Sequence, residues 1–337
     1  MLQAYLLRFH RWITLIFAIP LLVVIFTGLI LSFQPIVQTV AIKPGTLSFE
    51  KVDGLIARHD PDNKARGLFI DPYENSFSLI GVGPDGSVDV DLTTGADVEE
   101  DSQLSEWMSW SRRVHQRLIG SLGWLVNLST AAMLVLAALG VAMGWPRIRN
   151  NVSGWHKATG WFLLPLVVIS PLTGLFLAYN ISFNPAPPPA PAAAQQTGAP
   201  AQGGGPAQGA PAGRRGPQAA TMPIRDIVQL VAKDHDLSTL TSIGNRGGRM
   251  LVRLNDGGWL KVYTVTPQGL TPATNNWPRL IHEGNWSGIW GGLINVITSV
   301  ALLGLLFTGL FIWARRTFRK RPARNRSGPV TAPQAAE

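Results

Sequence analysis

Two stretches of this chain decide its fold: residues 9–31, FHRWITLIFAIPLLVVIFTGLIL, and residues 155–177, WHKATGWFLLPLVVISPLTGLFL. Each stretch places a histidine 17 residues before a Thr-Gly pair, His10 before Thr27 and His156 before Thr173. Each is apolar over about 20 residues, the length that a helix needs to cross the hydrocarbon of a bilayer. The match indicates an internal repeat of membrane-spanning helices.

Two further apolar stretches complete the repeat. Uncharged segments cover residues 12–33, 118–145, 158–179 and 284–314, and His115 and His282 precede the second and the fourth. A hairpin of two spans around an external segment has therefore been duplicated. The predicted fold class is a mainly α membrane protein: a four-helix transmembrane bundle from a duplicated hairpin, with two small α+β modules outside the bilayer.

The external segments repeat as well. Residues 52–60, VDGLIARHD, and residues 224–236, IRDIVQLVAKDHD, have the apolar spacing of amphipathic helices. Short β-rich stretches separated by Gly, Pro, Asp and Asn follow each of them. Each module is therefore predicted to be one helix on a small antiparallel sheet.

These patterns divide the chain into nine segments. The predicted order is an N-terminus with the first span (1–33), the first module (34–112), the second span (113–146), a short loop (147–157), the third span (158–181), a Pro/Ala/Gly-rich disordered linker (182–220), the second module (221–281), the fourth span (282–314) and a basic tail (315–337).

Positive charge sets the predicted orientation. The two termini and the loop between spans two and three hold twelve of the 29 basic residues, and their only acidic residue is Glu337. Basic segments stay on the cytoplasmic side, so both termini are predicted to be cytoplasmic. The rest of the chain is close to neutral, which argues against nucleic acid as a partner.

The sequence contains no cysteine. This excludes covalently attached c-type haem, thiolate-held iron–sulfur clusters and disulfides. Basic residues precede the apolar run of the first span, as in a signal peptide, but this run is longer than the 7 to 15 residues of a signal-peptide core. It is therefore predicted to remain as a span.

The four boundary histidines are the candidate metal ligands. The order of the spans puts His10 and His156 at one membrane face and His115 and His282 at the other. The faces are about 25 to 30 Å apart, so each face offers two ligands, whereas protein zinc sites normally use three or four. Haem iron needs two axial ligands from the protein, and two neutral imidazoles give an electron-carrying centre. We therefore predict two non-covalent haem groups.

Basic side chains near each pair are candidate contacts for haem propionates. They are Arg8, Arg11 and Lys157 at the inner face, and Arg112, Arg113, Arg117 and Arg279 at the outer face. Contact with lipid headgroups is the alternative. A single boundary histidine is more often an interfacial polar residue than a ligand, but four at matching boundaries favour ligation. His59 and His235, each next to aspartates at the end of a soluble helix, are interpreted as surface residues.

The paired H-x(16)-TG spans, the Gly-Trp-Pro-Arg exit at residues 144–147, the segment DLTTGADVEED at residues 91–101 and the two helix-plus-sheet modules resemble the PepSY-associated transmembrane family. That group includes iron-regulated membrane proteins and siderophore-iron reductases of Gram-negative inner membranes. The resemblance covers nearly the whole chain except the linker and the tail. The second module departs from the pattern, because VYTVTPQG at residues 262–269 replaces a D-P-x-T-G turn.

The resemblance implies an inner-membrane protein with periplasmic PepSY-like modules and two haem b groups. It implies that His10 pairs with His156, and His115 with His282, and that electrons reach a ferric siderophore or another ferric chelate in the periplasm. The donor is a separate cytoplasmic protein, a flavin or membrane quinol, because no nucleotide-binding fingerprint follows a strand. The predicted docking region is near Trp107, Trp110 and Trp277. The alternatives are a non-enzymatic scaffold or regulator and a component of siderophore or haem transport.

Overall fold

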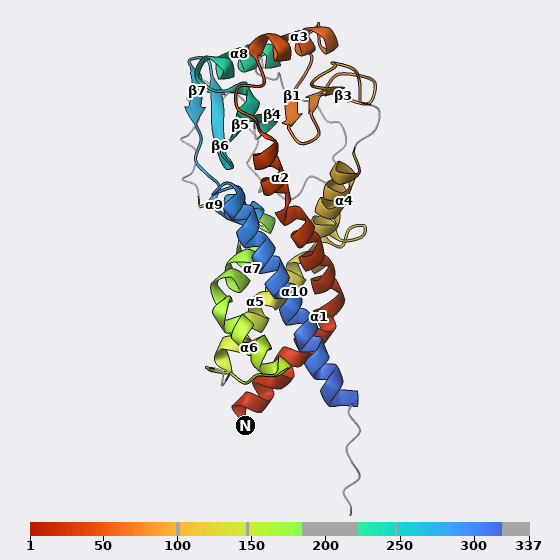
Figure 1. The fold of residues 1–337 in the computed structure, drawn as a ribbon, viewed down its shortest axis with the longest axis vertical. Coiled ribbons are helices and arrows are strands. Elements are labelled where there is room, and N and C mark those ends of the chain that lie inside the picture. The colour runs from red at the N-terminus through yellow and green to blue at the C-terminus, as the bar shows by residue number, and fades with distance from the viewer. Residues whose placement is uncertain (99–101, 146–147, 184–221, 247, 319–337) are drawn as a thin grey trace, which may run out of the picture.

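A computed structural model describes residues 1–98, 102–145, 148–183, 222–246 and 248–318. Nearly all of the predicted linker and most of the basic tail lie outside the described residues, as does Arg147 of the predicted loop. The described chain has two layers along its long axis: a group of long helices that includes the N-terminus, and a sheet covered by two helices at the far end (Figure 1).

The long helices carry the apolar segments. They are α1 (Leu2–Ser32), α2 (Gln34–Ala41), α5 (Gly123–Ala142), α6 (Val152–Phe162), α7 (Leu164–Ala178) and α10 (Ile289–Phe318). Three of the helical segments, Leu2–Ala41, Gly123–Ala142 and Ile289–Phe318, are long and apolar enough to cross a membrane. α6 and α7 form a fourth candidate if the pair, bent by 64°, counts as one span. Pro165 in the first turn of α7 lacks a backbone donor, which explains the break after Phe162.

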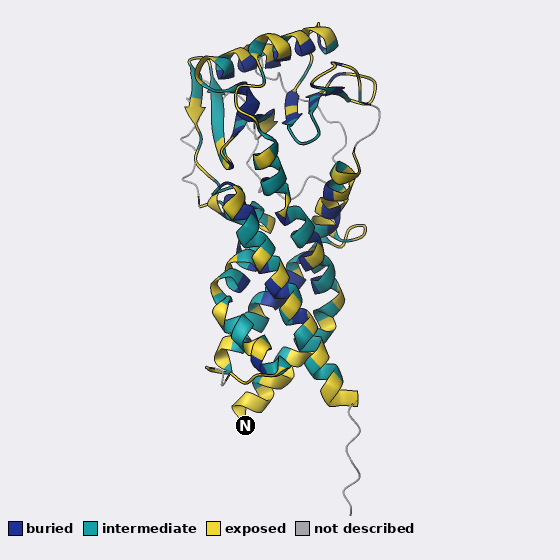
Figure 2. Cartoon of the chain, in the orientation of Figure 1, coloured by how far each residue is buried: buried dark blue, intermediate teal, exposed yellow. Residues whose placement is uncertain are grey.

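The long helices pack around a small apolar core. α1 lies against α10 and α5, α5 against α7, and α10 against α6. Large apolar side chains also cover the outside, for example Ile19 at 77% and Phe162 at 85% exposure. Exposed positions are yellow along the long helices in Figure 2. An outer surface of this kind requires lipid, so the structure is that of a membrane protein. The core residues are Leu21, Ile25, Met133, Val167, Leu302 and Leu306.

The two predicted modules form one continuous antiparallel sheet. Its strand order is β3-β2-β1-β4-β5-β6-β7, and the halves meet where β1 pairs with β4 through Leu68 and Ile243. The strands are β1 (Gly67–Asp71), β2 (Ser76–Ile80), β3 (Ser87–Asp91), β4 (Leu240–Arg246), β5 (Arg249–Asp256), β6 (Trp259–Thr266) and β7 (Gly269–Pro272), with a 3₁₀ turn, η2 (Leu237–Thr239), before β4.

Helices α3 (Phe49–His59) and α8 (Ile224–Asp234) cover one face of this sheet (Figure 1). Arg225 of α8 pairs with Asp53 of α3 and ties the two helices together. Alternation along the strands sends every second side chain into the core beneath them. The fully buried core residues include Leu68, Phe77, Leu79, Ile227, Val228 and Ile243.

Two further helices connect the sheet to the bundle and lie between it and the long helices (Figure 1). These are α4 (Gln103–Arg117) and α9 (Trp277–Glu283). Each begins at a side-chain cap, Ser102 for α4 and Asn276 for α9, and α9 ends at Gly284 in the left-handed conformation (φ 78°). His115 lies near the end of α4 and His282 near the end of α9, so the sheet-bearing part of the molecule positions both.

Replacing Ile243 by alanine tests whether the β1–β4 junction holds the halves together. Ile243 is completely buried, so the cavity should lower the free energy of unfolding by about 3 kcal/mol. Thermal unfolding in detergent should show a lower midpoint for Ile243→Ala and no change for Thr271→Ala, an exposed site on edge strand β7. Equal midpoints for the two variants would contradict the shared core.

Candidate functional site

The four boundary histidines meet in the two pairs that the order of the spans predicts. The rings of His10 and His156 have centroids 6.4 Å apart, and those of His115 and His282 have centroids 6.0 Å apart. The first is called here the terminal pair, because α1 begins beside it. The second is called the sheet-side pair. Each pair joins two different helices: α1 and α6 in the terminal pair, and α4 and α9 in the sheet-side pair.

Thr-Gly pairs on the long helices hold three of the four rings. Nδ1 of His115 lies 3.2 Å from the hydroxyl of Thr27, and Nδ1 of His282 lies 3.3 Å from that of Thr173. The ring of His115 lies flush on Gly28, where an added Cβ would come within 3.1 Å of Cε1. His282 lies in the same way on Gly174, with a corresponding distance of 3.0 Å. A larger residue than glycine would displace either ring.

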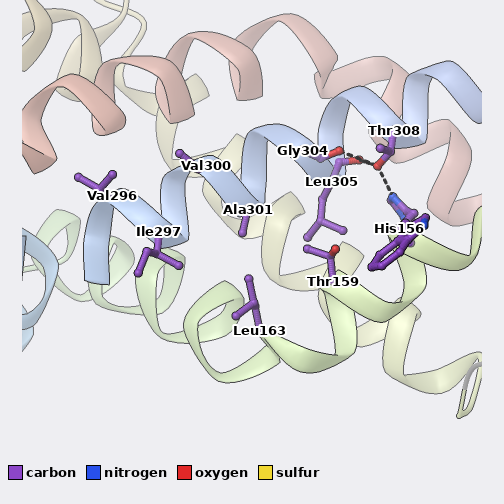
Figure 3. A pocket seen from close by; sticks show the side chains of 11 residues that line it. His156, Thr159, Leu163, Val296, Ile297, Val300, Ala301, Gly304, Leu305 and Thr308 are labelled. Atoms are coloured by element: carbon purple, nitrogen blue, oxygen red, sulfur yellow. Dashed lines mark hydrogen bonds between the residues drawn. The ribbon is translucent and has the colours of Figure 1, made fainter. Parts of the chain in front are cut away.

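The terminal pair has a third Thr-Gly pair, which the sequence analysis missed. Thr308 of α10 hydrogen-bonds to Nδ1 of His156 at 2.8 Å (Figure 3). Gly309 lies against the same ring, where an added Cβ would come within 3.5 Å of Cε1. A search for every Thr-Gly pair within the apolar spans would have found it. His10 differs, because its buried Nδ1 has no hydrogen-bond partner among the described residues.

The hydrogen bonds define which ring nitrogen carries the proton. Each threonine hydroxyl donates its own proton to a backbone carbonyl one turn earlier: Thr27 to Val23, Thr173 to Ile169 and Thr308 to Gly304. The hydroxyl oxygen therefore accepts from Nδ1–H of the histidine.

Backbone carbonyls accept from the same nitrogen at the sheet-side pair, Val24 for His115 at 3.0 Å and Ser170 for His282 at 3.2 Å. With Nδ1 protonated, the lone pair of Nε2 is available to a metal ion.

The spacing of the rings suits one metal ion between each pair. A metal-bound imidazole nitrogen lies about 2 Å from the ion and roughly 1 Å from the centre of its own ring, so two imidazoles on opposite sides of an ion have centroids roughly 6 Å apart. Both observed distances agree with this value. No cluster of three or more His, Cys, Asp or Glu residues with metal-binding geometry occurs in the described part of the chain. Each histidine pair would offer an ion two side chains, a number that suits haem better than zinc.

A cavity of about 440 Å³ opens beside the terminal pair, between α10 and the α6–α7 break (Figure 3). Its walls are apolar except near His156, where two threonine side chains also line it. Three of its lining residues, Trp155, Ile297 and Val300, are more than half exposed on the outer surface of the helices, so the cavity is open on that side. The lining includes His156, Thr159, Leu163, Ala301, Gly304 and Thr308.

The basic side chains predicted near the pairs have different surroundings. Arg279 is half-buried on α9 and pairs with Glu283 at 3.3 Å, and Arg112 donates to the side chain of Gln34 at the start of α2. The others are exposed around the helix ends: Arg8, Arg11, Arg113, Arg117 and Lys157. Trp107 and Trp110 pack edge to face on α4, with centroids 5.9 Å apart, and Trp277 begins α9.

The α9 helix is locked onto the start of α10. Nδ2 of Asn295 donates to the carbonyls of His282 at 2.9 Å and Ile281 at 3.3 Å. Gly284 and Gly291 touch backbone to backbone, so a Cβ atom on Gly291 would overlap the carbonyl of Gly284. This close packing fixes His282 relative to the bundle. Gly291 and Asn295 are therefore positioning residues for His282.

A profile described as the PepSY-associated TM region matches residues 7–316. The fold and the paired histidines thus define a multi-span membrane protein with an attached α+β part. The chain belongs to the PepSY-associated transmembrane family, and the predicted resemblance is confirmed. No curated protein matches the sequence significantly.

Alanine at Gly174 tests the fit of His282 against α7. The added methyl group would press on the ring, and the cost should exceed the roughly 1 kcal/mol that alanine gains over glycine within a helix. Gly140→Ala is the matched control, because open space surrounds that position on α5. We expect the thermal unfolding midpoint to fall for Gly174→Ala and to rise for Gly140→Ala. A rise in both would show that His282 does not rest on Gly174.

Asp71 on the sheet face toward α4 should make stability depend on pH. Burial raises the pKa of Asp71 from 3.8 to about 6; Tyr73 and Arg112 oppose the rise, and Glu74 adds to it. The folded state therefore binds this proton more tightly than the unfolded state does. The stabilisation from the Asp71 proton is complete below about pH 4 and is lost as the pH rises through about 6. The free energy of unfolding then falls by about 3 kcal/mol.

Asp71→Asn should remove this dependence. The variant should unfold at a higher temperature than the wild type at about pH 7.5 and at a similar temperature at about pH 4. Asp89→Asn, on edge strand β3, serves as the control. If Asp71→Asn lowers the unfolding midpoint at about pH 7.5, the ionised carboxylate stabilises the fold, and the predicted direction of the pH dependence is wrong.

Proposed function

We propose that this protein is a di-haem b electron-transfer protein of the bacterial inner membrane that reduces a ferric siderophore or another ferric chelate in the periplasm. The observation that carries the proposal is the spacing of the two histidine pairs, 6.4 Å and 6.0 Å between ring centroids. Both values suit two axial imidazoles on one iron. Membership of the PepSY-associated transmembrane family is consistent with it.

The residues of this chain would hold one haem at each end of the bundle. His10 and His156 would ligate the group at the terminal end, and His115 and His282 the group at the sheet-side end. When bound, haem b supplies one-electron redox chemistry, and two such groups offer electrons a path across the bilayer. Thr27, Thr173 and Thr308 keep the imidazoles in the ligating tautomer, because each accepts from Nδ1–H.

The chain also provides the separation that the path needs. On α1, the ligand His10 and the supporting Thr27 lie 17 residues apart, a rise of about 25 Å along a helix. Apolar side chains fill the space between the two ends, and Leu21, Ile25 and Leu302 are buried there. The charges at the helix ends favour a cytoplasmic terminal pair and a periplasmic sheet. Electrons would then move from a cytoplasmic donor or quinol to the periplasmic side.

A ferric chelate is the proposed acceptor. Adding one electron converts Fe(III) to Fe(II), which hard oxygen ligands hold less tightly, so the iron is released without cleavage of the chelator. The sheet-side pair is the end from which this reduction would occur. The alternative is a membrane scaffold or regulator whose sheet binds a partner.

The visible spectrum of the protein purified in detergent tests the proposal. We expect sharp reduced α and β bands after dithionite and two haems per chain. His282→Ala should retain about one haem per chain and lose reduction of ferric chelate. His235→Ala is the control, since His235 packs on Tyr263 away from both pairs. A colourless wild-type preparation would contradict the proposed redox function and favour the alternative of a membrane scaffold or regulator.

A further inference from the structure

The cavity beside the terminal pair is an elongated groove in the outer surface of the bundle. Its α10 wall runs from Val296 to Thr308, about 18 Å of helix, and its other wall is formed by α6 and the α6–α7 break (Figure 3). Trp155, Ile297 and Val300 are the exposed residues on its open side. In a membrane this surface faces lipid, so a molecule dissolved in the bilayer can enter the groove from the side. The groove is called here the lateral groove.

The lateral groove is distinct from the space between the two rings of the terminal pair. His156 lines the groove, whereas His10 and the other residues of α1 do not. A molecule in the groove would therefore touch the imidazole of His156 without touching that of His10. The groove thus gives a lipid-soluble molecule direct access to one of the proposed haem ligands.

Thr159 provides the lateral groove with a polar group that has no partner in the protein. Other threonines inside the long helices donate to the carbonyl one turn earlier, as Thr130 does to Val126 and Thr298 to Ile294. The hydroxyl of Thr159 makes no hydrogen bond to any described residue, and the side chain is half-buried in the groove wall (Figure 3). Polar groups in such places normally find a partner, so the hydroxyl is available to a bound molecule.

We propose that the lateral groove binds a membrane quinol and that this quinol is the electron donor to the terminal end of the bundle. A quinol has a flat ring with a hydroxyl group at each end and a long apolar tail. The ring would lie against Thr159 and His156, and the tail would follow the apolar wall past Val300 and Ile297 into lipid. The volume of about 440 Å³ is within the range of about 300 to 1,000 Å³ for small-molecule sites.

A phospholipid acyl chain is the other candidate occupant of an apolar groove. It would satisfy the apolar walls, but it has no polar group at the depth of Thr159. Thr159 can accept a hydrogen bond from a quinol hydroxyl and donate one to a quinone carbonyl, so the same side chain suits both states of the donor. The hydroxyl therefore favours a quinol over a phospholipid.

The electrons balance if one quinol serves two ferric chelates. Oxidation of the quinol to the quinone breaks two O–H bonds and releases two protons and two electrons. The electrons would pass one at a time through the two haem groups and reduce two Fe(III) chelates to Fe(II). The inference deepens the proposed electron-transfer function and rests on it for the role of donor.

Binding of oxidised quinones to the full-length protein in detergent tests the site. Decylubiquinone and a menaquinone with a one-isoprene tail are the probes, and calorimetry measures their affinity whether or not haem is present. We expect the wild type to bind at least one of them. Thr159→Val, which removes the hydroxyl at nearly constant size, should weaken binding by about fivefold. Thr159→Ser should retain most of the affinity.

Filling the groove tests its shape. Gly304 lines the groove, and open space surrounds the position of an added Cβ, so the side chain of Gly304→Leu would occupy the groove. We expect this variant to weaken quinone binding by about tenfold or more. Gly140→Leu is the matched control, because Gly140 on α5 also faces open space and does not line the groove. It should bind quinone as the wild type does.

The rate of haem reduction tests the role of donor. The reduced form of the bound probe is mixed with oxidised protein, and the α band is followed relative to the band that dithionite produces. Thr159→Val should slow reduction by the quinol about fivefold and leave reduction by dithionite unchanged, since dithionite does not need the groove. If Gly304→Leu fails to fold or loses haem, Thr159→Val decides the outcome.

Failure of the wild type to bind either quinone would overturn the proposal and leave phospholipid as the occupant. Unchanged affinity in both Thr159→Val and Gly304→Leu would overturn it as well. Groove-dependent quinone binding by a protein without haem would support the site and refute the electron-transfer function. Haem that dithionite reduces but the bound quinol does not would refute the donor and leave the electron-transfer function standing. The two failures are therefore distinguishable.

Discussion

The arrangement depends on holding imidazole rings from different helices about 6 Å apart inside an apolar bundle. Lipid provides no hydrophobic force between helices, so close packing and interhelical hydrogen bonds must position the rings. Thr-Gly pairs provide both, because the glycine lets the ring approach the helix and the threonine accepts from Nδ1–H. Each of α1 and the α6–α7 pair carries a ligand candidate for one end and a Thr-Gly support for the other. The two ends are therefore coupled through the same helices.

The duplication is not symmetrical at the terminal pair. His115 and His282 have equivalent supports on α1 and α7, as the repeat requires. At the other end, α10 supplies Thr308 and Gly309 to His156. The sequence of α5 contains no Thr-Gly pair, and Nδ1 of His10 is buried without a hydrogen-bond partner among the described residues. A histidine without this hydrogen bond has a less fixed ring orientation, and its other ring nitrogen is less basic. The two ends of the bundle thus differ in how firmly the chain positions its paired histidines.

The single sheet explains how the two hairpins act as one unit. Pairing of β1 with β4 fuses the segments that follow the first and third spans, and one core lies beneath α3 and α8. Helices α4 and α9, which carry His115 and His282, lie between that sheet and the long helices (Figure 1). Asp71 and Arg253 are on the face of the sheet opposite its core. A partner that contacts the sheet would act on the same end of the bundle.

The sequence alone determined the apolar spans, the repeat, the family and the pairing of the histidines, because each follows from local composition or from the order of segments along the chain. The fusion of two modules into one sheet required the tertiary structure, since edge strands carry no sequence mark of their partner. The same holds for the supports of the rings. His115 depends on Thr27 and His156 on Thr308, residues 88 and 152 positions away, and only helix packing brings them together.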